Sequence, residues 1–482
     1  MLTTYQREHL LPAYEHHAPQ LYPRTLEASR AHVVMLSEQG LIPQERAVLL
    51  LGALQKLRSE PPRLPEYDGT FEDVYFAFER KLAEAAGIDH RSLDVQLARS
   101  RNDLDAGIFR MILRDQLTEV AEAASAAAAA ALAAADRTAE SVIIGLTHRR
   151  PAQPTTLGHV LAGYAEALVG AVRNYDSVLD ELQASPLGSC AFAGTDLPIA
   201  PERVASLLGF DRQIVNSYEA VAGADHLLAV GFANARALAT GARLVRLIQD
   251  WMTWGWIDTP AEFCQGSSIM PQKRNPVVLE HMVSMAGMES ADAASVVNNI
   301  SSAWWEDSNN ATTDVQVRLW ESNDRARRFF TLMARLLETM TVLTLPAAEQ
   351  LVDAGTTTTA AADVLSRAGV PFRAAHDALG TLIRAGSPSS WTPQQVSAVV
   401  SEVAPDVDVD EATIARVMEA ARNPRVVLER AQSDGPGSAA VRSQVATLGR
   451  SLKSVVEAID SRKQRIAAAA SDLDVVVDGY LS

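Results

Sequence analysis

The spacing of apolar residues along this chain is that of the α-helix almost everywhere. Leu104, Ile108, Met111 and Ile112 lie at i, i+4, i+7 and i+8, so their side chains share one face of a helix. Residues 125–135 are almost pure alanine, which has the highest helix propensity and lets neighbouring helices approach closely. Alternating strand patterns are nearly absent, and a short strand candidate at 141–145 stands alone. The pattern predicts an all-α fold with the alanine run in a packed bundle helix rather than in a low-complexity linker.

Clusters of proline and glycine divide this pattern into long helices. Helices are expected over residues 157–184, 216–254 and 277–298, with loops at 148–154, 188–201 and 260–276. Pro61, Pro62 and Pro65 separate two further helical stretches near the N-terminus. Helices of 25 residues or more span about 40 Å and usually belong to bundles or to oligomer cores.

Net charge and cysteine content restrict the partners and the compartment. The sequence holds 43 lysine and arginine residues against 59 aspartate and glutamate residues, a formal net charge of −16. Nucleic acid and anionic membranes require clustered positive charge, so neither is expected as a partner. Cys190 and Cys264 are too few for a disulfide framework, and the N-terminus does not resemble a signal peptide. No apolar run reaches the ~18 uncharged residues of a membrane span, and we expect a cytoplasmic protein.

The segment Gly266-Ser-Ser-Ile-Met-Pro-Gln-Lys-Arg-Asn-Pro276 is the most informative one in the chain. Pro276 suits the first turn of a helix, where its missing N–H is not needed. The segment therefore places a hydroxyl, the cation of Lys273 and the amide of Asn275 beside a helix N-terminus. Composition alone would favour a plain surface loop, but this arrangement is suited to an anionic intermediate.

The same segment resembles the signature loop of the fumarase/aspartase superfamily, GSSxMPxKxNP, with every fixed position filled. That resemblance implies anti elimination across a succinyl Cα–Cβ bond with release of fumarate. Other segments resemble motifs of the argininosuccinate lyase branch: Arg99–Asp103 its SRND motif, Thr147-His148 with Ala152–Pro154 its THxQxAQP segment, and Glu72–Val74 its EDIH motif. Gly369–His376 resembles the C-terminal domain of that branch, so the resemblance covers essentially the whole chain.

The resemblance implies a role for each matching residue. Ser267 corresponds to the general base that removes the weakly acidic Cβ proton, and Lys273 to a group that binds the carboxylate on which charge accumulates. His148 corresponds to a histidine that orients groups or moves protons, and Glu280 to the carboxylate that pairs with it. The implied substrate-binding residues, which hold the succinyl carboxylates and their surroundings, are Ser29, Ser100, Arg101, Asn102, Thr147, Asn275 and Gln316.

No metal and no cofactor are expected, because the elimination needs only acid–base groups and charge stabilisation. His16 and His17 have no third ligand at metal spacing. His159 and His281 lie in helical patterns and are interpreted as structural. Trp304-Trp305 could belong to the core or to the wall of the substrate site, and the resemblance favours the site.

Departures from the branch concern the part of the site that holds the leaving amine. The stretch YNRDLQEDK of argininosuccinate lyases reads Ala311–Leu319 here, so Gln316 is retained while the tyrosine and the terminal lysine are lost. We therefore expect a fumarate-releasing carbon–nitrogen lyase acting on an N-substituted aspartate, an N-succinyl amine whose amine is not necessarily arginine. An argininosuccinate lyase proper and a non-catalytic structural relative, like the lens crystallins of this family, are the alternatives.

The resemblance also implies the architecture. Three helical domains are expected, at residues 1–105, 106–358 and 359–482, the central one being a bundle of long helices. Four copies would pack these bundles into a twenty-helix core of a homotetramer, with each site shared between three subunits. The separation of the matching segments near residues 100, 148 and 270 along the chain agrees with that expectation.

Overall fold

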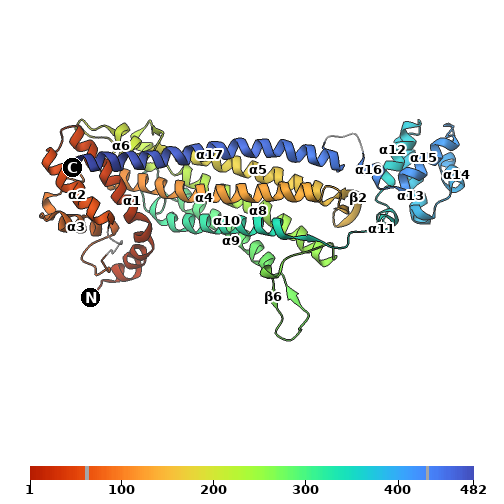
Figure 1. Ribbon diagram of the computed structural model, residues 1–482, viewed down its shortest axis with the longest axis horizontal. Helices are drawn as coiled ribbons and strands as arrows, with labels where there is room; N and C mark the ends of the chain where they lie inside the picture. Colours follow the sequence, from red (N-terminus) through yellow and green to blue (C-terminus); the bar gives the residue numbers. More distant parts are fainter. Residues whose placement is uncertain (60–64, 430–433) are drawn as a thin grey trace.

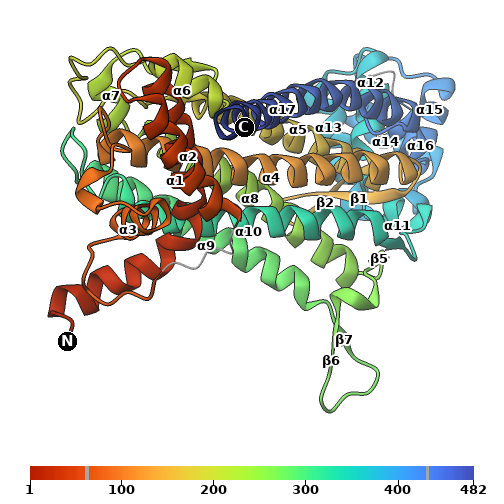
Figure 2. The ribbon, with the colours of Figure 1, turned by 60° about the vertical axis from the view of Figure 1, so that its left-hand side comes forward.

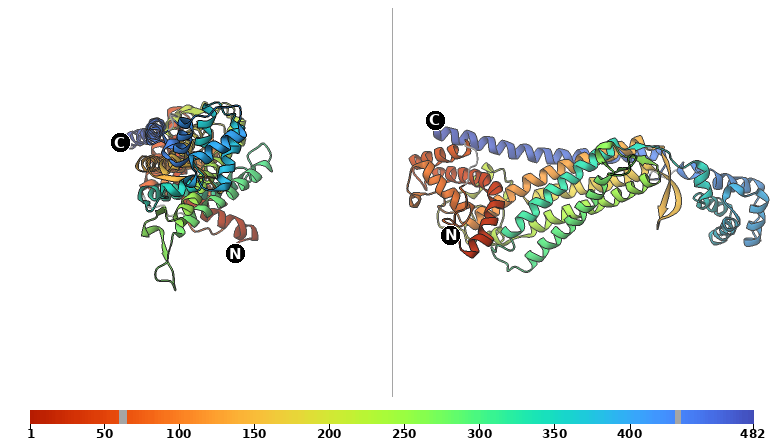
Figure 3. Two further views of the ribbon diagram at one scale, coloured as in Figure 1. Left: turned by 90° about the vertical axis from the view of Figure 1, so that its right-hand side faces the viewer. Right: turned by 90° about the horizontal axis from the view of Figure 1, so that it is seen from below.

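The computed structural model describes residues 1–59, 65–429 and 434–482, and it is an elongated helical molecule (Figure 1). The expected all-α class is confirmed, with small two-stranded sheets as additions. Pro61 and Pro62 lie outside the described residues. Figure 3 shows from below how helices near one end, the long bundle and a separate small group of helices follow one another.

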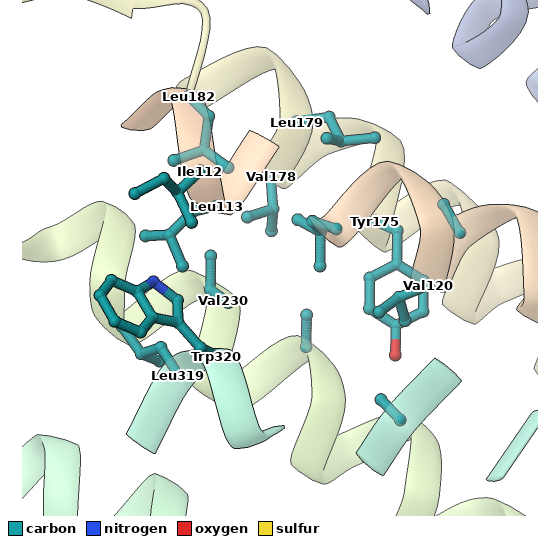
Figure 4. Close-up of a cluster of buried hydrophobic side chains, with 14 of the residues drawn as sticks. Ile112, Leu113, Val120, Tyr175, Val178, Leu179, Leu182, Val230, Leu319 and Trp320 are labelled. Atoms are coloured by element: carbon teal, nitrogen blue, oxygen red, sulfur yellow. The ribbon is translucent and has the colours of Figure 1, made fainter. Parts of the chain in front are cut away.

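A bundle of long helices forms the centre of the molecule. Its members are α4 (Arg101–Arg137), α5 (Leu157–Glu181), α8 (Asp225–Thr253), α9 (Val277–Ser301), α10 (Thr313–Thr339) and α17 (Ser438–Leu481). At one end lie η1 (Gln6–Leu10), α1 (Leu11–Glu38), α2 (Gln44–Ser59), α3 (Val74–Ala86), η2 (His90–Ser92), α6 (Pro201–Leu207) and α7 (Ser217–Ala222). The helices of one main hydrophobic core pack together, as the close-up of Figure 4 shows for α4, α5, α8 and α10.

The alanine run is the packed part of α4. Ala124, Ala127, Ala128, Ala131 and Ala135 are fully buried, because α10, α5 and α17 cover successive faces of the helix. Gly158 marks the closest approach, since a Cβ there would lie 2.5 Å from the carbonyl oxygen of Ala135. α4 is long and apolar enough by composition to cross a membrane, and slightly more than half of its most apolar window is buried within the protein, as in a core helix.

A second, smaller core lies beyond the other end of the bundle. It is built from α12 (Thr358–Arg367), α13 (Phe372–Ala385), α14 (Pro393–Val403) and α15 (Glu411–Arg422), with α11 (Ala348–Asp353), η4 (Pro388–Ser390) and α16 (Arg425–Leu428) beside them. The structure divides the expected 359–482 segment: its first part forms this core, whereas α17 returns along α4 and α5. The apolar residues of α17, such as Val455 and Ile459, are buried in the main core, which explains its position.

The short strands form four pairs. Three pairs are antiparallel: β1 (Val142–Thr147) with β2 (Arg150–Thr156), β5 (Ile257–Asp258) with β8 (Thr341–Val342), and β6 (Gln265–Gly266) with β7 (Arg274–Asn275). The fourth pair, β3 (Ala184–Ser185) with β4 (Arg212–Gln213), is parallel. The expectation of a lone strand at 141–145 and a loop at 148–154 is wrong. Both strands of a two-stranded sheet are edge strands, so prolines 151 and 154 fit within β2.

The expected helix over 216–254 is also interrupted. The side chain of Asn216 accepts hydrogen bonds from the first backbone N–H groups of α7 and caps that helix. Gly223 then leaves the helical conformation, and α8 begins at Asp225. A Cβ at Gly223 would lie 2.7 Å from the backbone carbonyl oxygen of Glu219, so this break depends on glycine. η3 (Ala261–Phe263) is a single turn between β5 and β6.

Candidate active site

The N-terminus of α4 is a closed, capped structure. Ser100 accepts a hydrogen bond from the backbone N–H of Asn102 at 3.3 Å, and its own N–H donates to the Asp103 carboxylate at 2.9 Å. This reciprocal capping box fixes the position of Ser100 and Asn102, two residues expected to bind the succinyl carboxylates. The side-chain amide of Asn102 also donates to the carbonyl oxygen of Ala191 at 3.4 Å.

Asp103 connects this helix end to the loop after β3. It is fully buried, and its second oxygen accepts hydrogen bonds from the N–H groups of Gly188 at 3.0 Å and Cys190 at 3.1 Å. Burial raises the pKa of Asp103 to about 6, although the three N–H donors act in the opposite direction. The motif Ser-x-x-Asp is a capping signature, so the capping role of Asp103 could have been predicted from the sequence.

Arg101 is surrounded by carboxylates of its own chain. Its guanidinium forms ion pairs with Asp73 at 2.5 Å and Asp105 at 3.3 Å, and it lies over the rings of Tyr75 and Phe76. Burial raises the pKa of Asp105 to about 6. Arg101, which the resemblance predicts to bind a substrate carboxylate, is therefore paired with two carboxylates of its own chain.

Two cavities adjoin Arg101. One, of about 270 Å³, is lined by Asn102, Asp105, Asp307 and Asn309 among others. The other, of about 150 Å³, is lined by Asp73, Asp105, Asp314 and His17 among others. Asp105 and Asp307 were not singled out in the sequence, although Asp105 stands one helical turn after Arg101, where an ion pair is expected.

Ser29 and Gln316 are buried within the chain. Ser29 is fully buried in α1 and accepts a hydrogen bond from the Arg99 guanidinium at 3.3 Å. The Gln316 amide donates to the carbonyl oxygen of Thr312 at 2.9 Å, and its own oxygen has no partner among the described residues. Neither side chain lines one of the two cavities beside Arg101.

His148 and Arg149 form the tip of the β1–β2 hairpin. Thr147 pairs with Arg150, so the turn has two central residues, and both have positive φ, 50° at His148 and 65° at Arg149. Such a turn matches the twist of a hairpin but is normally built with glycine or asparagine. Arg149 is held by an ion pair with Asp250 of α8, and Thr147 and His148 are exposed.

The segment from Gly266 to Pro276 is a projecting loop closed at its base by β6 and β7 (Figure 2). The hydroxyl oxygen of Ser267 accepts hydrogen bonds from the backbone N–H groups of Ile269 at 3.4 Å and Met270 at 3.0 Å. These donors would stabilise negative charge on that oxygen. Lys273 is exposed, and Ile269 and Met270 expose apolar side chains.

The three motif segments lie apart in one chain. α4 has 37 residues and spans about 55 Å, and it separates the Ser100 end from the β1–β2 hairpin. The Ser267 loop projects from the side of the bundle (Figures 1 and 2). Glu280 is exposed near the start of α9, and among the described residues it makes no ion pair with His148. One chain brings Ser100, Arg101 and Asn102 together but not Thr147, His148, Ser267, Lys273 or Asn275 with them.

Comparison with known proteins decides the family. The family described as Lyase matches residues 28–288, which include α4, the hairpin and the Ser267 loop. The chain belongs to this lyase family. The match covers more than half of the sequence and includes every segment of the candidate site up to Glu280.

Individual relatives place this lyase in the argininosuccinate lyase-like branch. The chain is 31% identical to argininosuccinate lyase of Natronomonas pharaonis over 475 residues, 96% of this chain and 92% of the relative. It is 32% identical to argininosuccinate lyase 2 of Agrobacterium fabrum over 363 residues, 74% of this chain and 71% of the relative. The expected branch is confirmed, and the chain is a carbon–nitrogen lyase.

Solved structures of lyases share the fold of this chain. The crystal structure of EDDS lyase in complex with formate matches with a TM-score of 0.82 and 26% sequence identity, covering 96% of this chain and 92% of that chain. A fumarate lyase from Mesorhizobium sp. BNC1, at 16% identity, shares the fold with a TM-score of 0.70.

Proposed function

We propose that this lyase releases fumarate from an N-substituted aspartate by anti elimination. The observation that carries the proposal is the hydroxyl oxygen of Ser267, which accepts two backbone N–H hydrogen bonds in a loop that also holds Lys273. A serine hydroxyl is a poor base unless its alkoxide is stabilised, and two N–H donors with a nearby cation supply that stabilisation. The N–H donors leave the other side of the oxygen for a substrate proton.

The chemistry then follows from charge. The Ser267 alkoxide removes a proton from Cβ, and the electron pair moves onto the neighbouring carboxylate, where Lys273 and Asn275 stabilise the added negative charge. The electrons return to form the Cα–Cβ double bond of fumarate as the Cα–N bond breaks. The departing nitrogen keeps the electron pair of the broken Cα–N bond and is protonated as it leaves. His148, with Glu280, would orient groups or move protons.

We propose that the complete site forms in a homotetramer. The Ser100 end of α4, the hairpin tip and the Ser267 loop are too far apart within one chain to touch one substrate. Thr147 and the hairpin tip are exposed, as is most of the loop, so another subunit can approach them. Three subunits would each supply one of the three segments. Such a protein would work in the cytoplasm without a metal or cofactor.

The surroundings of Arg101 support a cationic leaving amine. The cavities beside it are lined by Glu72, Asp73, Asp105, Asp307 and Asp314, with Arg101 as the only lysine or arginine lining them among the described residues. Carboxylates at this density favour a positively charged ligand. An N-succinyl derivative of a diamine or guanidine therefore fits better than an aminopolycarboxylate.

Fumarate release from a panel of N-succinyl amines tests this function. We expect turnover of at least one N-substituted aspartate with a cationic amine, followed by absorbance of fumarate and by mass spectrometry of the amine. Ser267→Ala should lower turnover by about 10²–10⁴-fold, whereas Ser268→Ala, which removes the adjacent exposed hydroxyl, should retain most of it. Turnover of argininosuccinate alone would favour argininosuccinate lyase proper, the activity named for its relatives. No fumarate from any member of the panel would contradict the proposal.

A further inference from the structure

Exposed aromatic side chains gather near the N-terminal end of α4. Phe192 lies in the loop between β3 and α6, Tyr218 in the first turn of α7, and Trp304 and Trp305 in the segment between α9 and α10. These four side chains, the aromatic rim, are between 38% and 77% exposed. The rings of Phe192 and Tyr218 contact each other edge to face, with their centroids 5.5 Å apart. Exposed apolar groups that gather in this way mark an interaction site more often than a single exposed ring does.

Hydrogen bonds join the segments that carry the aromatic rim to one another and to α4. The Tyr218 hydroxyl donates to the carbonyl oxygen of Trp305 at 2.8 Å, and the serine before Tyr218 donates to the carbonyl oxygen of Phe192 at 2.7 Å. The side-chain amide of Asn102 donates to the carbonyl oxygen of Ala191, the residue before Phe192, at 3.4 Å. The rim is therefore tied to a residue that is predicted to bind a carboxylate of the succinyl group.

The cavity of about 270 Å³ beside Arg101 has walls that continue into the aromatic rim. One wall is α7, where Val221 lines the cavity about one turn after Tyr218. Another is the segment before α10, where Asp307 lines the cavity two residues after Trp305. A ligand that fills the cavity and extends out of it would therefore meet the aromatic rim.

Asp307 brings a carboxylate without a counter-ion to this cavity. It accepts a hydrogen bond from the Thr312 hydroxyl at 3.5 Å, and it forms no ion pair with any residue in the part of the chain that the structure describes. Asp105, which lines the same cavity, is instead paired with Arg101. An unpaired carboxylate favours a positively charged ligand group, and the faces of aromatic rings attract cations as well. Both features beside the cavity therefore favour the same kind of ligand group.

We propose that Asp307 and the aromatic rim form the subsite for the leaving amine and select an amine that carries an alkylated ammonium or a guanidinium group. This inference rests on the proposed function, because the succinyl group of the same substrate would lie at Ser100 and Asn102. Asp307 would supply the counter-charge, and the ring faces would attract a cation that is bulky and weakly hydrated. Trp305 and Asp307 would then be residues that determine specificity, without a part in proton transfer.

Fumarate release from two N-succinyl amines of the same shape tests this subsite. One carries a trimethylammonium group on a short alkyl chain, and the other carries the uncharged tert-butyl group in its place. Because the two groups differ mainly in charge, the first compound should have a kcat/KM about tenfold above the second in the full-length enzyme. Equal values would overturn the proposal. If neither compound releases fumarate while another N-succinyl amine does, the proposed function stands and the subsite is wrong, whereas no fumarate from any N-succinyl amine contradicts both.

Two substitutions assign the preference to its residues. For the trimethylammonium compound, Asp307→Asn should lower kcat/KM about fivefold and Trp305→Ala about threefold to tenfold, and both losses should be smaller for the tert-butyl compound. The matched controls are Glu306→Gln, an exposed carboxylate that lines neither cavity beside Arg101, and Phe372→Ala, an exposed ring of α13. Both controls should leave the two values unchanged.

Two results with these variants would overturn the proposal. An equal loss of kcat/KM for both compounds in Asp307→Asn would show that this carboxylate does not read the charge of the amine. A change of oligomeric state in Trp305→Ala, measured by size-exclusion chromatography, would show that a second copy of the chain covers the aromatic rim instead of a substrate.

Discussion

The two ends of α4 differ in how much of a site one chain completes. At the N-terminal end, Ser100, Arg101 and Asn102 are fixed by a capping box, by ion pairs and by the buried carboxylate of Asp103. At the opposite end, the β1–β2 hairpin presents His148 to solvent on a strained two-residue turn. The Ser267 loop is likewise exposed and is braced mainly by its own backbone. In the proposed function, the substrate-binding segment at the N-terminal end of α4 would therefore be preformed, whereas the exposed hairpin and loop would need neighbouring subunits to complete the site.

The largest expected effect is the loss of activity when the exposed Ser267 loop is changed. Ser267→Ala removes the proposed base and should lower kcat by about 10²–10⁴-fold, with little change in stability because the hydroxyl bonds only within its own loop. Steady-state fumarate release and thermal unfolding measure the two effects. An unchanged kcat would remove serine as the base.

A substitution at the N-terminal end of α4 should instead act mainly on the stability of the protein. Asp103→Ala leaves the N–H groups of Ser100, Gly188 and Cys190 without their acceptor, and should lower the free energy of unfolding by about 1–3 kcal/mol. Glu119→Ala, at an exposed position of the same helix, is the control and should cost less than about 0.5 kcal/mol. Urea unfolding measures both, and equal stability of the two variants would show that Asp103 does not fix this end.

The smallest expected effect is a pH dependence of stability that arises from Asp105, at the same end of α4. Burial raises the pKa of Asp105 from 3.8 to about 6, despite Arg101 beside it, so the folded state holds a proton that the unfolded state releases. The Asp105 contribution to the free energy of unfolding should therefore fall as pH rises from about 4 to about 6, by less than about 1 kcal/mol for this quarter-exposed group. Asp105→Asn should remove that contribution, whereas the contribution of Asp103, whose pKa is also raised to about 6, should remain. Equal slopes in urea titrations of both proteins would contradict the shift.

The sequence predicted the helices well where their own periodicity decides them. Leu157–Glu181 and Val277–Ser301 match the expected 157–184 and 277–298 to within a few residues. Prediction from the sequence failed where an element depends on contacts with residues far along the chain or on strand pairing. The β2 strand contains prolines that a lone pattern assigns to a loop, and α17 belongs to the main core through contacts with helices over 250 residues earlier.

In the candidate site, too, the sequence predicts local features but not contacts between distant residues. Motif spacing could predict Ser267, Lys273 and Asn275 as site residues, because they are local to one loop. The ion pairs of Arg101 with Asp73 and Asp105 depend on how α3 meets α4, and the burial of Ser29 depends on the packing of α1. No local pattern reports these contacts, so the sequence did not predict the carboxylates that pair with Arg101.

Mixing two inactive variants tests most directly whether different chains complete one site. Ser267→Ala and Asn102→Ala proteins are unfolded together in equal amounts, refolded and assayed for fumarate release from an accepted N-succinyl amine. If the two segments of a site come from different chains, half of the sites receive an intact loop and half of those an intact Asn102, so about one quarter of wild-type activity should return. If hybrid oligomers form, as shown by differently tagged chains eluting together, and no activity returns, both segments belong to one chain and the account is wrong.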